Sequence, residues 1–185
     1  ASGVLSPGNK VTAEIDKNRR LQIMRNHTAA HLLQAALRET LGTHVEQAGQ
    51  LVNENEVRFD FTHFNAMTDE EIATVENRVN EFILSAQKVE MMEMPIEEAK
   101  KMGAMMLFGE KYGDVVRVVK AGDFSTEFCG GTHVSNSGQL GLFKIVSEAS
   151  VASGVRRITA LTGTNVIDYL NKQENTVKAV ASSLK

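Results

Sequence analysis

The feature that most constrains this chain is a pair of short patterns lying far apart in the sequence. His27-Thr28-Ala29-Ala30-His31 belongs to an apolar-periodic run that predicts a helix. Cys129-Gly130-Gly131-Thr132-His133 contains the only cysteine of the chain. A spacing of four places both histidines of the first pattern on one helical face. The glycine pair of the second allows a tight loop that presents its Cys and His together.

Three histidines and one cysteine form a complete tetrahedral ligand set for zinc. Because a lone His-x-x-x-His is common on ordinary amphipathic helices, the hypothesis of one Zn²⁺ rests on the combination of both patterns. The set lacks the glutamate of the His-Glu-x-x-His pattern, which disfavours peptide hydrolysis, and it has fewer cysteines than a usual zinc finger. The candidate metal ligands are His27, His31, Cys129 and His133.

The composition is that of an ordinary globular protein. A hydrophobic fraction of 42% in 185 residues supports one buried core. The single cysteine excludes an intramolecular disulfide and is typical of a reducing compartment. No stretch approaches the roughly 20 apolar residues that cross a membrane, and no signal peptide is recognisable. We therefore expect a cytoplasmic protein without a membrane partner. The Gly/Ser/Pro-rich start at Ala1 suggests a piece of a longer chain.

The net charge of −3 is not typical of a free-standing nucleic-acid-binding protein. Basic residues are dense only over 17–25 and at Arg156-Arg157. Solvated surface is the simpler interpretation of both clusters, and contact with RNA is the alternative. His44 and His63 lie outside the ligand patterns and are expected to be structural or surface residues.

The spacing of apolar residues predicts an α+β fold, in which helices flank an antiparallel sheet around a zinc-containing cleft. Helices are expected over 26–41, with Asn26 as a possible N-cap, over 68–86, opened by a capping box of Thr68 and Glu71, over 95–101, and from 165 onward. Strands are expected over 11–15, 45–52, 57–61, 89–94, 115–120, 141–148 and 156–162, with a turn at 16–18. The methionines between Met91 and Met106 are expected to fill the core.

Six motifs, in order, resemble the editing domain of bacterial alanyl-tRNA synthetase, and more distantly free-standing alanyl-tRNA deacylases and the editing domain of threonyl-tRNA synthetase. The resemblance covers roughly residues 15–163. The motifs are Arg25–Leu33, Gln47-Ala48-Gly49-Gln50-Leu51-Val52, Arg58-Phe59-Asp60-Phe61, Phe108-Gly109-Glu110-Lys111-Tyr112, Phe124–His133 and Gly154-Val155-Arg156-Arg157-Ile158.

The resemblance implies hydrolysis of the ester that joins serine or glycine wrongly to the acceptor end of tRNA(Ala). It places the family's metal ligands on the four residues above, its pocket glutamine on Gln47, and its substrate-facing loop on Gly130 and Gly131. Backbone N–H groups of that loop are expected to stabilise an oxyanion. The resemblance also implies a parent enzyme that joins alanine to tRNA with ATP and Mg²⁺ in a domain outside this chain. Any oligomerisation of that parent is expected to use regions beyond this piece.

Two departures from the family pattern concern the substrate. Many relatives have a second threonine where this chain has Ala30, so discrimination of serine is expected to be looser, or to involve Thr28 or another group. A lysine usual after the hairpin glutamine is replaced by Ala48, which removes one possible phosphate contact. Arg156 is expected to face solvent or tRNA.

The expected organisation has three parts. Residues 1–14 are a remnant of an upstream barrel or a linker, 15–163 are the zinc-dependent editing domain, and 164–185 are a helix that starts a linker or coiled coil. Glu127 or Asp123 is a candidate to orient a ligand histidine.

Four protein ligands are typical of structural zinc, so several functions stay open. The alternatives to a zinc-dependent editing hydrolase are a tRNA-binding module with structural zinc, a free-standing deacylase, and a cysteine hydrolase with Cys129 as nucleophile and His133 as base. A metal-dependent enzyme acting on small molecules is disfavoured by the remaining motifs.

Overall fold

The helix that carries His27 and His31 begins earlier than the sequence predicts. In the computed structural model, which describes residues 3–4, 6–106 and 112–184, α1 spans Lys17–Leu41. The carboxylate of Asp16 accepts a hydrogen bond from the backbone N–H of Arg19 at 2.9 Å and caps the helix. The predicted turn over 16–18 is therefore wrong.

Asn26, the predicted N-cap, is instead buried in the middle of α1. Its amide donates to the carbonyl of Asn53 at 2.7 Å and accepts from the hydroxyl of Thr162 at 2.6 Å. These bonds attach α1 to a hairpin and to a neighbouring strand. A polar residue that resembled a helix start in the sequence thus fixes how the helix packs.

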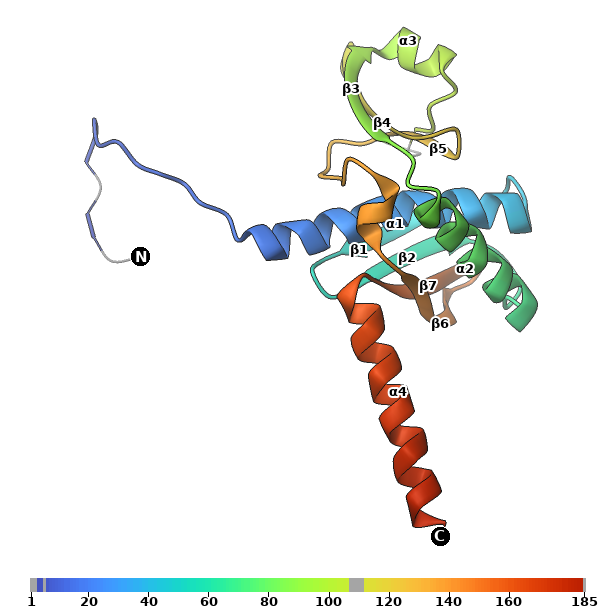
Figure 1. Cartoon of the computed structure of the whole chain (residues 1–185). Helices are drawn as coiled ribbons and strands as arrows, with labels where there is room; N and C mark the ends of the chain where they lie inside the picture. The colour runs from blue at the N-terminus through green and yellow to red at the C-terminus, as the bar shows by residue number, and fades with distance from the viewer. Residues whose placement is uncertain (1–2, 5, 107–111, 185) are drawn as a thin grey trace.

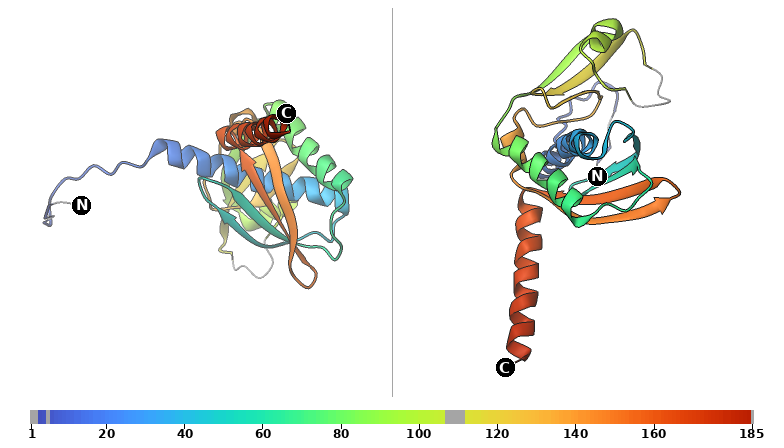
Figure 2. Two further views of the ribbon diagram at one scale, coloured as in Figure 1. Left: turned by 90° about the horizontal axis from the view of Figure 1, so that it is seen from below. Right: turned by 90° about the vertical axis from the view of Figure 1, so that its right-hand side faces the viewer.

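A four-stranded antiparallel sheet lies under α1 (Figure 1). A second helix, α2 (Asp69–Leu84), begins with the predicted Thr68–Glu71 capping box and covers the same face of the sheet, as the right view of Figure 2 shows. The buried face carries large apolar side chains that pack against α1, including Phe59, Phe61 and Ile158. In spatial order, the strands are β1 (Gln47–Val52), β2 (Val57–Thr62), β7 (Val155–Thr162) and β6 (Phe143–Ala152).

A second, three-stranded antiparallel sheet lies on the other side of α1, so the fold has two sheets where one was expected (Figure 1). It packs against the short helix α3 (Ile96–Lys101) around a small separate core. Its last strand escaped prediction because it has four residues. The spatial order is β3 (Val89–Pro95), β4 (Val115–Ala121) and β5 (Ser125–Phe128).

The methionine cluster fills the core only in part. Met92 and Met94 pack against the small core, as expected, whereas Met91, Met102 and Met106 are exposed by 41–42%. The motif at 108–111 lies outside the described residues. A one-turn helix, η1 (Ser137–Leu140), follows the ligand loop and contacts α1 and α2.

The two ends of the chain lie apart from this core. The strand predicted over 11–15 is absent, because the segment extends away from the sheets and has no strand to pair with; Val11 and Ile15 are exposed (Figure 1). The predicted C-terminal helix is present as α4 (Thr164–Ser183), and Val166 is its one buried side chain. Among the described residues, no helix is long and apolar enough to span a membrane.

Candidate functional site

The two predicted ligand pairs meet between α1 and the loop that follows β5. His27 and His31 project from α1, while Cys129 and His133 come from the loop. One potential ligand atom from each residue lies within 4.8 Å of the other three. The fold thus brings together all four predicted metal ligands from opposite parts of the sequence.

The distances from the cysteine sulfur to two of the ring nitrogens fit tetrahedral zinc. The Sγ atom of Cys129 lies 3.5 Å from Nε2 of His27 and 3.3 Å from Nε2 of His133. Zn–N bonds of about 2.0–2.1 Å and Zn–S bonds of about 2.3 Å place tetrahedral neighbours about 3.3–3.6 Å apart. The donor types and these two separations suit one zinc ion, and the group as a whole, within 4.8 Å, is compact enough to close around it.

The hydroxyl of Thr28 determines which nitrogen of His133 faces the other ligands. It donates its single proton to the carbonyl of Met24 at 2.9 Å and accepts the backbone N–H of Val134 at 3.2 Å. Nδ1 of His133, 3.1 Å from this oxygen, must therefore be the donor in their contact. Nε2 is left with the lone pair that a metal requires.

A buried carboxyl group lies behind His31. Oε2 of Glu127 is 3.4 Å from Nδ1 of His31, which has no other partner among the described residues. Oε1 of Glu127 accepts a hydrogen bond from the hydroxyl of Ser125 at 2.7 Å. A carboxylate in this position orients a metal-binding imidazole and increases its basicity. Of the two expected candidates, Glu127 has this geometry, whereas Asp123 is fully exposed beside Lys120.

Burial keeps the imidazoles of the site neutral. It lowers the pKa of His27 and of His31 to about 4, and it lowers the pKa of His133 to about 2, with the neighbouring histidines adding to the effect. Burial raises the pKa of the Cys129 thiol and raises the pKa of Glu127 to about 7. Neutral imidazoles present lone pairs, and metal binding would displace the thiol proton.

Arg117 on β4 fixes the backbone of the ligand loop. Its Nη1 donates to the carbonyl of Cys129 at 3.1 Å and to the carbonyl of Gly131. The backbone N–H of Gly131 points to Sγ of Cys129 at 3.4 Å. The N–H of Gly131 is thus already engaged by the sulfur. Of the two predicted oxyanion donors, only Gly130 lines the cleft.

A cleft of about 390 Å³ opens beside this group. His27 and Cys129 line it, whereas His31 and His133 are buried, with 6% and 1% of their surfaces exposed. One edge of the ligand set is therefore accessible and the other is enclosed. The cleft is lined by His27, Gln50, Tyr112, Gly113, Val115, Val116, Arg117, Phe128, Cys129 and Gly130.

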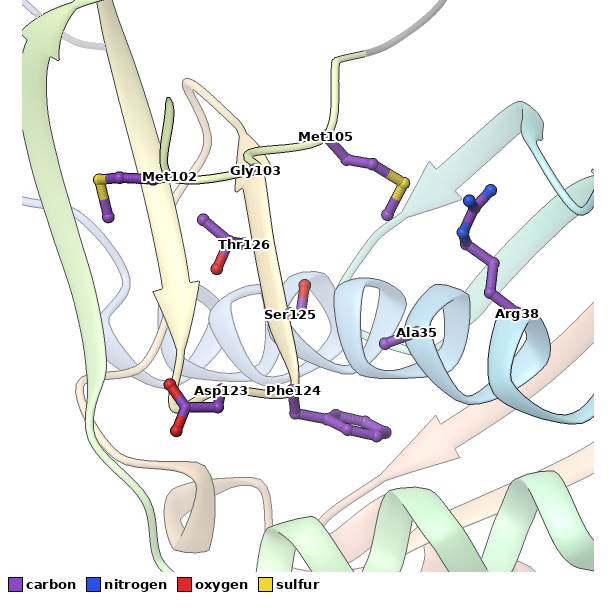
Figure 3. A pocket seen from close by; sticks show the side chains of 9 residues that line it. All are labelled: Ala35, Arg38, Met102, Gly103, Met105, Asp123, Phe124, Ser125 and Thr126. Carbon is purple, nitrogen blue, oxygen red and sulfur yellow. The ribbon is translucent and has the colours of Figure 1, made fainter. Parts of the chain in front are cut away.

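A second cavity, of about 340 Å³, lies between α1 and the turn that joins β4 to β5 (Figure 3). None of the four metal ligands lines it. Its lining includes Arg38 from α1, two methionines, and Ser125, the residue whose hydroxyl binds Glu127. Ser125 links this cavity to Glu127, which lies behind His31. Because the first cleft is lined by two of the metal ligands themselves, it is the candidate reaction site.

The predicted glutamine and a second glutamine share one face of β1. Gln47 pairs with Phe61 and Gln50 pairs with Phe59, on either side of a bulge at Ala48. Since directly paired residues lie on the same side of a sheet, both glutamines are on the side covered by α1. Gln50, and not Gln47, lines the cleft. Gln47 and Gln50 are three residues apart and would lie on opposite sides of a regular strand; the bulge places them on the same side.

The predicted substrate contacts are placed away from the cleft. Ala30 and Thr28 are each 1% exposed, within the core and beneath the metal ligands. Arg156 is engaged by Glu148 through two hydrogen bonds at 2.5 and 2.6 Å. These positions offer no surface to a ligand in the cleft.

Three further residues considered in the sequence lie outside the cleft, and two residues of the cleft were not anticipated. Arg157 pairs with Asp60, and His44 and His63 contact each other near the surface, as expected for residues outside the site. Sequence reasoning missed Gln50 and Arg117. The available signal for Arg117 was its position as a lone charge in the apolar run 115–119.

Comparisons with known proteins agree with this assembly. Residues 116–159 match the family described as "Threonyl and Alanyl tRNA synthetase second additional domain". The chain is 58% identical to an alanine–tRNA ligase of Acetivibrio thermocellus over 183 residues, which are 99% of this chain. It is 54% identical to an alanine–tRNA ligase of Neisseria meningitidis over 184 residues, which are 100% of this chain. It spans about a fifth of the length of these relatives, 21% in each case. The resemblance to alanyl-tRNA synthetases is thus confirmed.

Proposed function

We propose that this chain is the editing part of an alanyl-tRNA synthetase and that it hydrolyses the ester of serine or glycine wrongly attached to tRNA(Ala). The observation that carries the proposal is the ligand set itself: two ligands are enclosed, and two border a cleft large enough for a small aminoacyl ester. A synthetic site for alanine cannot exclude glycine by size and rejects serine weakly, so a second hydrolytic site is the physical remedy.

The reaction is attack of water on the ester carbonyl. The bond from the carbonyl carbon to the ribose oxygen breaks, the amino acid leaves as a carboxylic acid, and a proton passes to the ribose hydroxyl. The N–H of Gly130 is suited to stabilise the negative charge that develops on the carbonyl oxygen. Gln50, which lines the cleft, is suited to orient water or the amino-acid side chain. Gln47, on the same side of β1, is the glutamine to which the resemblance assigns this role.

Zn²⁺ held by His27, His31, Cys129 and His133 would supply a Lewis acid and fix the loop next to α1. The residues around the ligands favour this role, because Thr28 and Glu127 hold two of the rings in orientation. Four protein ligands are typical of structural zinc, and a catalytic role would require one of them to exchange with water or substrate. His27 and Cys129 are the ligands that border the cleft.

The placement of Thr28 and Ala30 changes the expected basis of specificity. Both lie beneath the ligand set, and the hydroxyl of Thr28 has its proton and its acceptor capacity in use. We therefore assign discrimination between serine and alanine to residues that line the cleft. Looser discrimination due to Ala30 is not expected from this geometry.

The remaining proposals concern the parent protein. Residues 15–163 would form the editing domain, with 1–14 as a linker or barrel remnant and 164–185 as the start of a linker or coiled coil. ATP, Mg²⁺ and attachment of alanine belong to parts of the parent outside this chain. The partner of the present piece would be the acceptor end of tRNA(Ala), in the cytoplasm.

A Gln47→Ala variant separates an enzyme from a binding module. If the chain is a hydrolase that uses Gln47, the variant loses hydrolysis of seryl-tRNA(Ala) and retains tRNA binding in a filter or fluorescence assay. A wild-type chain that binds this tRNA but never hydrolyses the ester would support the module instead. Alkylation that stops hydrolysis in a metal-free sample would support Cys129 as a nucleophile.

A further inference from the structure

We propose that Arg117 is an anion-binding residue of the cleft and that it holds an anionic oxygen of the 3′-terminal aminoacyl-nucleotide. Two sources have this chemistry: the phosphate of the terminal nucleotide and the oxyanion that develops as the ester is attacked. The inference rests on the proposed function for the identity of the ligand, but the anion site itself is read from the contacts of Arg117.

The guanidinium group of Arg117 is only partly used by the protein. One nitrogen, Nη1, donates to the carbonyls of Cys129 and Gly131, which fixes the plane of the group against the ligand loop. No other side-chain hydrogen bond and no ion pair of Arg117 occurs within residues 3–4, 6–106 and 112–184. Nε and Nη2 therefore retain donors for a ligand, in the planar arrangement that suits phosphate and carboxylate oxygens.

Arg117 lies at the reaction site. Arg117 lines the same cleft as His27 and Cys129. Its charge also reaches the ligand set: after burial and the two neighbouring histidines, Arg117 is a further cause of the lowered pKa of His133. A ligand beside the accessible metal ligands thus lies within reach of a fixed cation.

The charge of the cleft favours an anion. Zn²⁺ held by neutral histidines and one thiolate would carry one net positive charge, to which Arg117 adds a second. Among the described residues, no Asp or Glu lines the cleft. The apolar walls from Val116 and Phe128 limit screening by water. Arg117 is partly buried and contacts carbonyl groups but no carboxylate among the described residues, so an anion in the cleft would be favourable to it.

Binding of adenosine 5′-monophosphate and of adenosine to the zinc-loaded chain, followed by NMR titration, tests the phosphate. The wild-type chain should bind the monophosphate roughly tenfold or more tightly than adenosine, and the side-chain Nε–H signal of Arg117 should shift with the monophosphate alone. Arg117→Gln should bind the two equally, while Arg117→Lys should keep part of the preference. Lys120→Gln, which removes the same charge from the same strand, should behave as wild type.

The turnover of seryl-tRNA(Ala) tests the oxyanion. If Arg117→Gln retains its zinc and its preference for the monophosphate but loses kcat at saturating substrate, the anion is the oxyanion. A loss of preference with a raised KM identifies the phosphate. Zinc content is measured on every sample. If Arg117→Gln loses its metal, the shift of the Arg117 Nε–H signal in the wild-type chain still shows whether Arg117 contacts the phosphate. The proposal is overturned if the wild-type chain binds adenosine 5′-monophosphate and adenosine equally and if Arg117→Lys and Arg117→Gln both keep the wild-type kcat.

Discussion

The imidazole of His27 lies directly against Gly131, so closely that a Cβ atom at residue 131 would be 2.0 Å from Cε1 and 2.4 Å from Nδ1 of the ring. No side chain other than hydrogen fits this contact. At Gly130, in contrast, an added Cβ would meet no atom within 4 Å. The two glycines of the loop therefore have different roles, one in packing against a ligand and one in keeping the cleft open.

Gly131→Ala should displace His27 from the metal ligands. We expect zinc affinity to fall by about ten- to a hundredfold, the usual effect of a misoriented ligand, and hydrolysis to fall with it. Competition with a chelating indicator measures the affinity. Gly130→Ala is the matched control and should retain zinc; equal losses in the two variants would contradict this account of the loop.

Thr28→Val should destabilise the protein and weaken metal binding together. The change keeps the shape but leaves Nδ1 of His133 and the N–H of Val134 without their buried acceptor, at a cost of about 1–3 kcal/mol for each group. Urea unfolding with and without zinc measures both effects. Thr176→Val removes a similar hydroxyl–carbonyl bond on the exposed face of α4 and should change neither. A Thr28→Val protein with wild-type zinc affinity would show that this hydroxyl does not orient His133.

Glu127→Gln should weaken zinc binding without unfolding the chain. Glutamine fills the same space, but its amide is a poorer acceptor for the Nδ1 proton of His31, so we expect roughly a tenfold loss or more. Chelator competition and the rate of zinc release report this change directly. Asp123→Asn, at the fully exposed carboxylate, should match the wild type. Identical affinities in Glu127→Gln and Asp123→Asn would remove Glu127 from the site.

The metal-free chain should lose stability as the pH falls below about 6.5. Each of the three ligand histidines has a pKa lowered from 6.5, so between about pH 4 and pH 6.5 the unfolded chain binds protons that the folded chain does not. The free energy of unfolding then decreases by about 1.4 kcal/mol per pH unit for each neutral histidine. The pKa of Glu127 is raised to about 7, so this group alone would make the folded chain more stable as the pH falls. The three histidines together outweigh it.

Urea unfolding in the presence of a chelator, at about pH 5 and about pH 7, checks this prediction. The Tm from thermal unfolding should move in the same direction. Equal stability at the two pH values would mean that the histidines are protonated in the folded chain, and that the site is not prepared for a metal.

The ligand set could be predicted from the sequence because each of its two ligand pairs is defined by residues only four positions apart. Spacing alone places His27 and His31 on one face of a helix, and the Gly-Gly pair explains the Cys129–His133 loop. The capping box at Thr68 is equally local, and it is present. The α+β class follows from the alternation of helical and strand-like periods. Each of these features depends on residues a few positions apart.

Features that depend on distant contacts were not predictable in this way. Asn26 resembled a helix start, but its amide binds the distant Asn53 and Thr162. The division into two sheets and the proximity of Arg117 to the ligand loop depend on strand pairing. The bulge at Ala48 decides the side of β1 on which Gln47 and Gln50 lie, and a bulge carries no clear sequence signal.

The most direct test of the central claim is the rate at which the purified chain hydrolyses seryl-tRNA(Ala) and alanyl-tRNA(Ala), measured with zinc bound, after chelation, and after zinc is restored. The account predicts about one zinc per chain and hydrolysis of the seryl ester in preference to the alanyl ester. It also predicts that this activity is lost on chelation and recovered with zinc. Hydrolysis that is unaffected by complete metal removal, or a zinc-loaded chain that binds the seryl-tRNA and leaves its ester intact, would contradict a metal-dependent editing site.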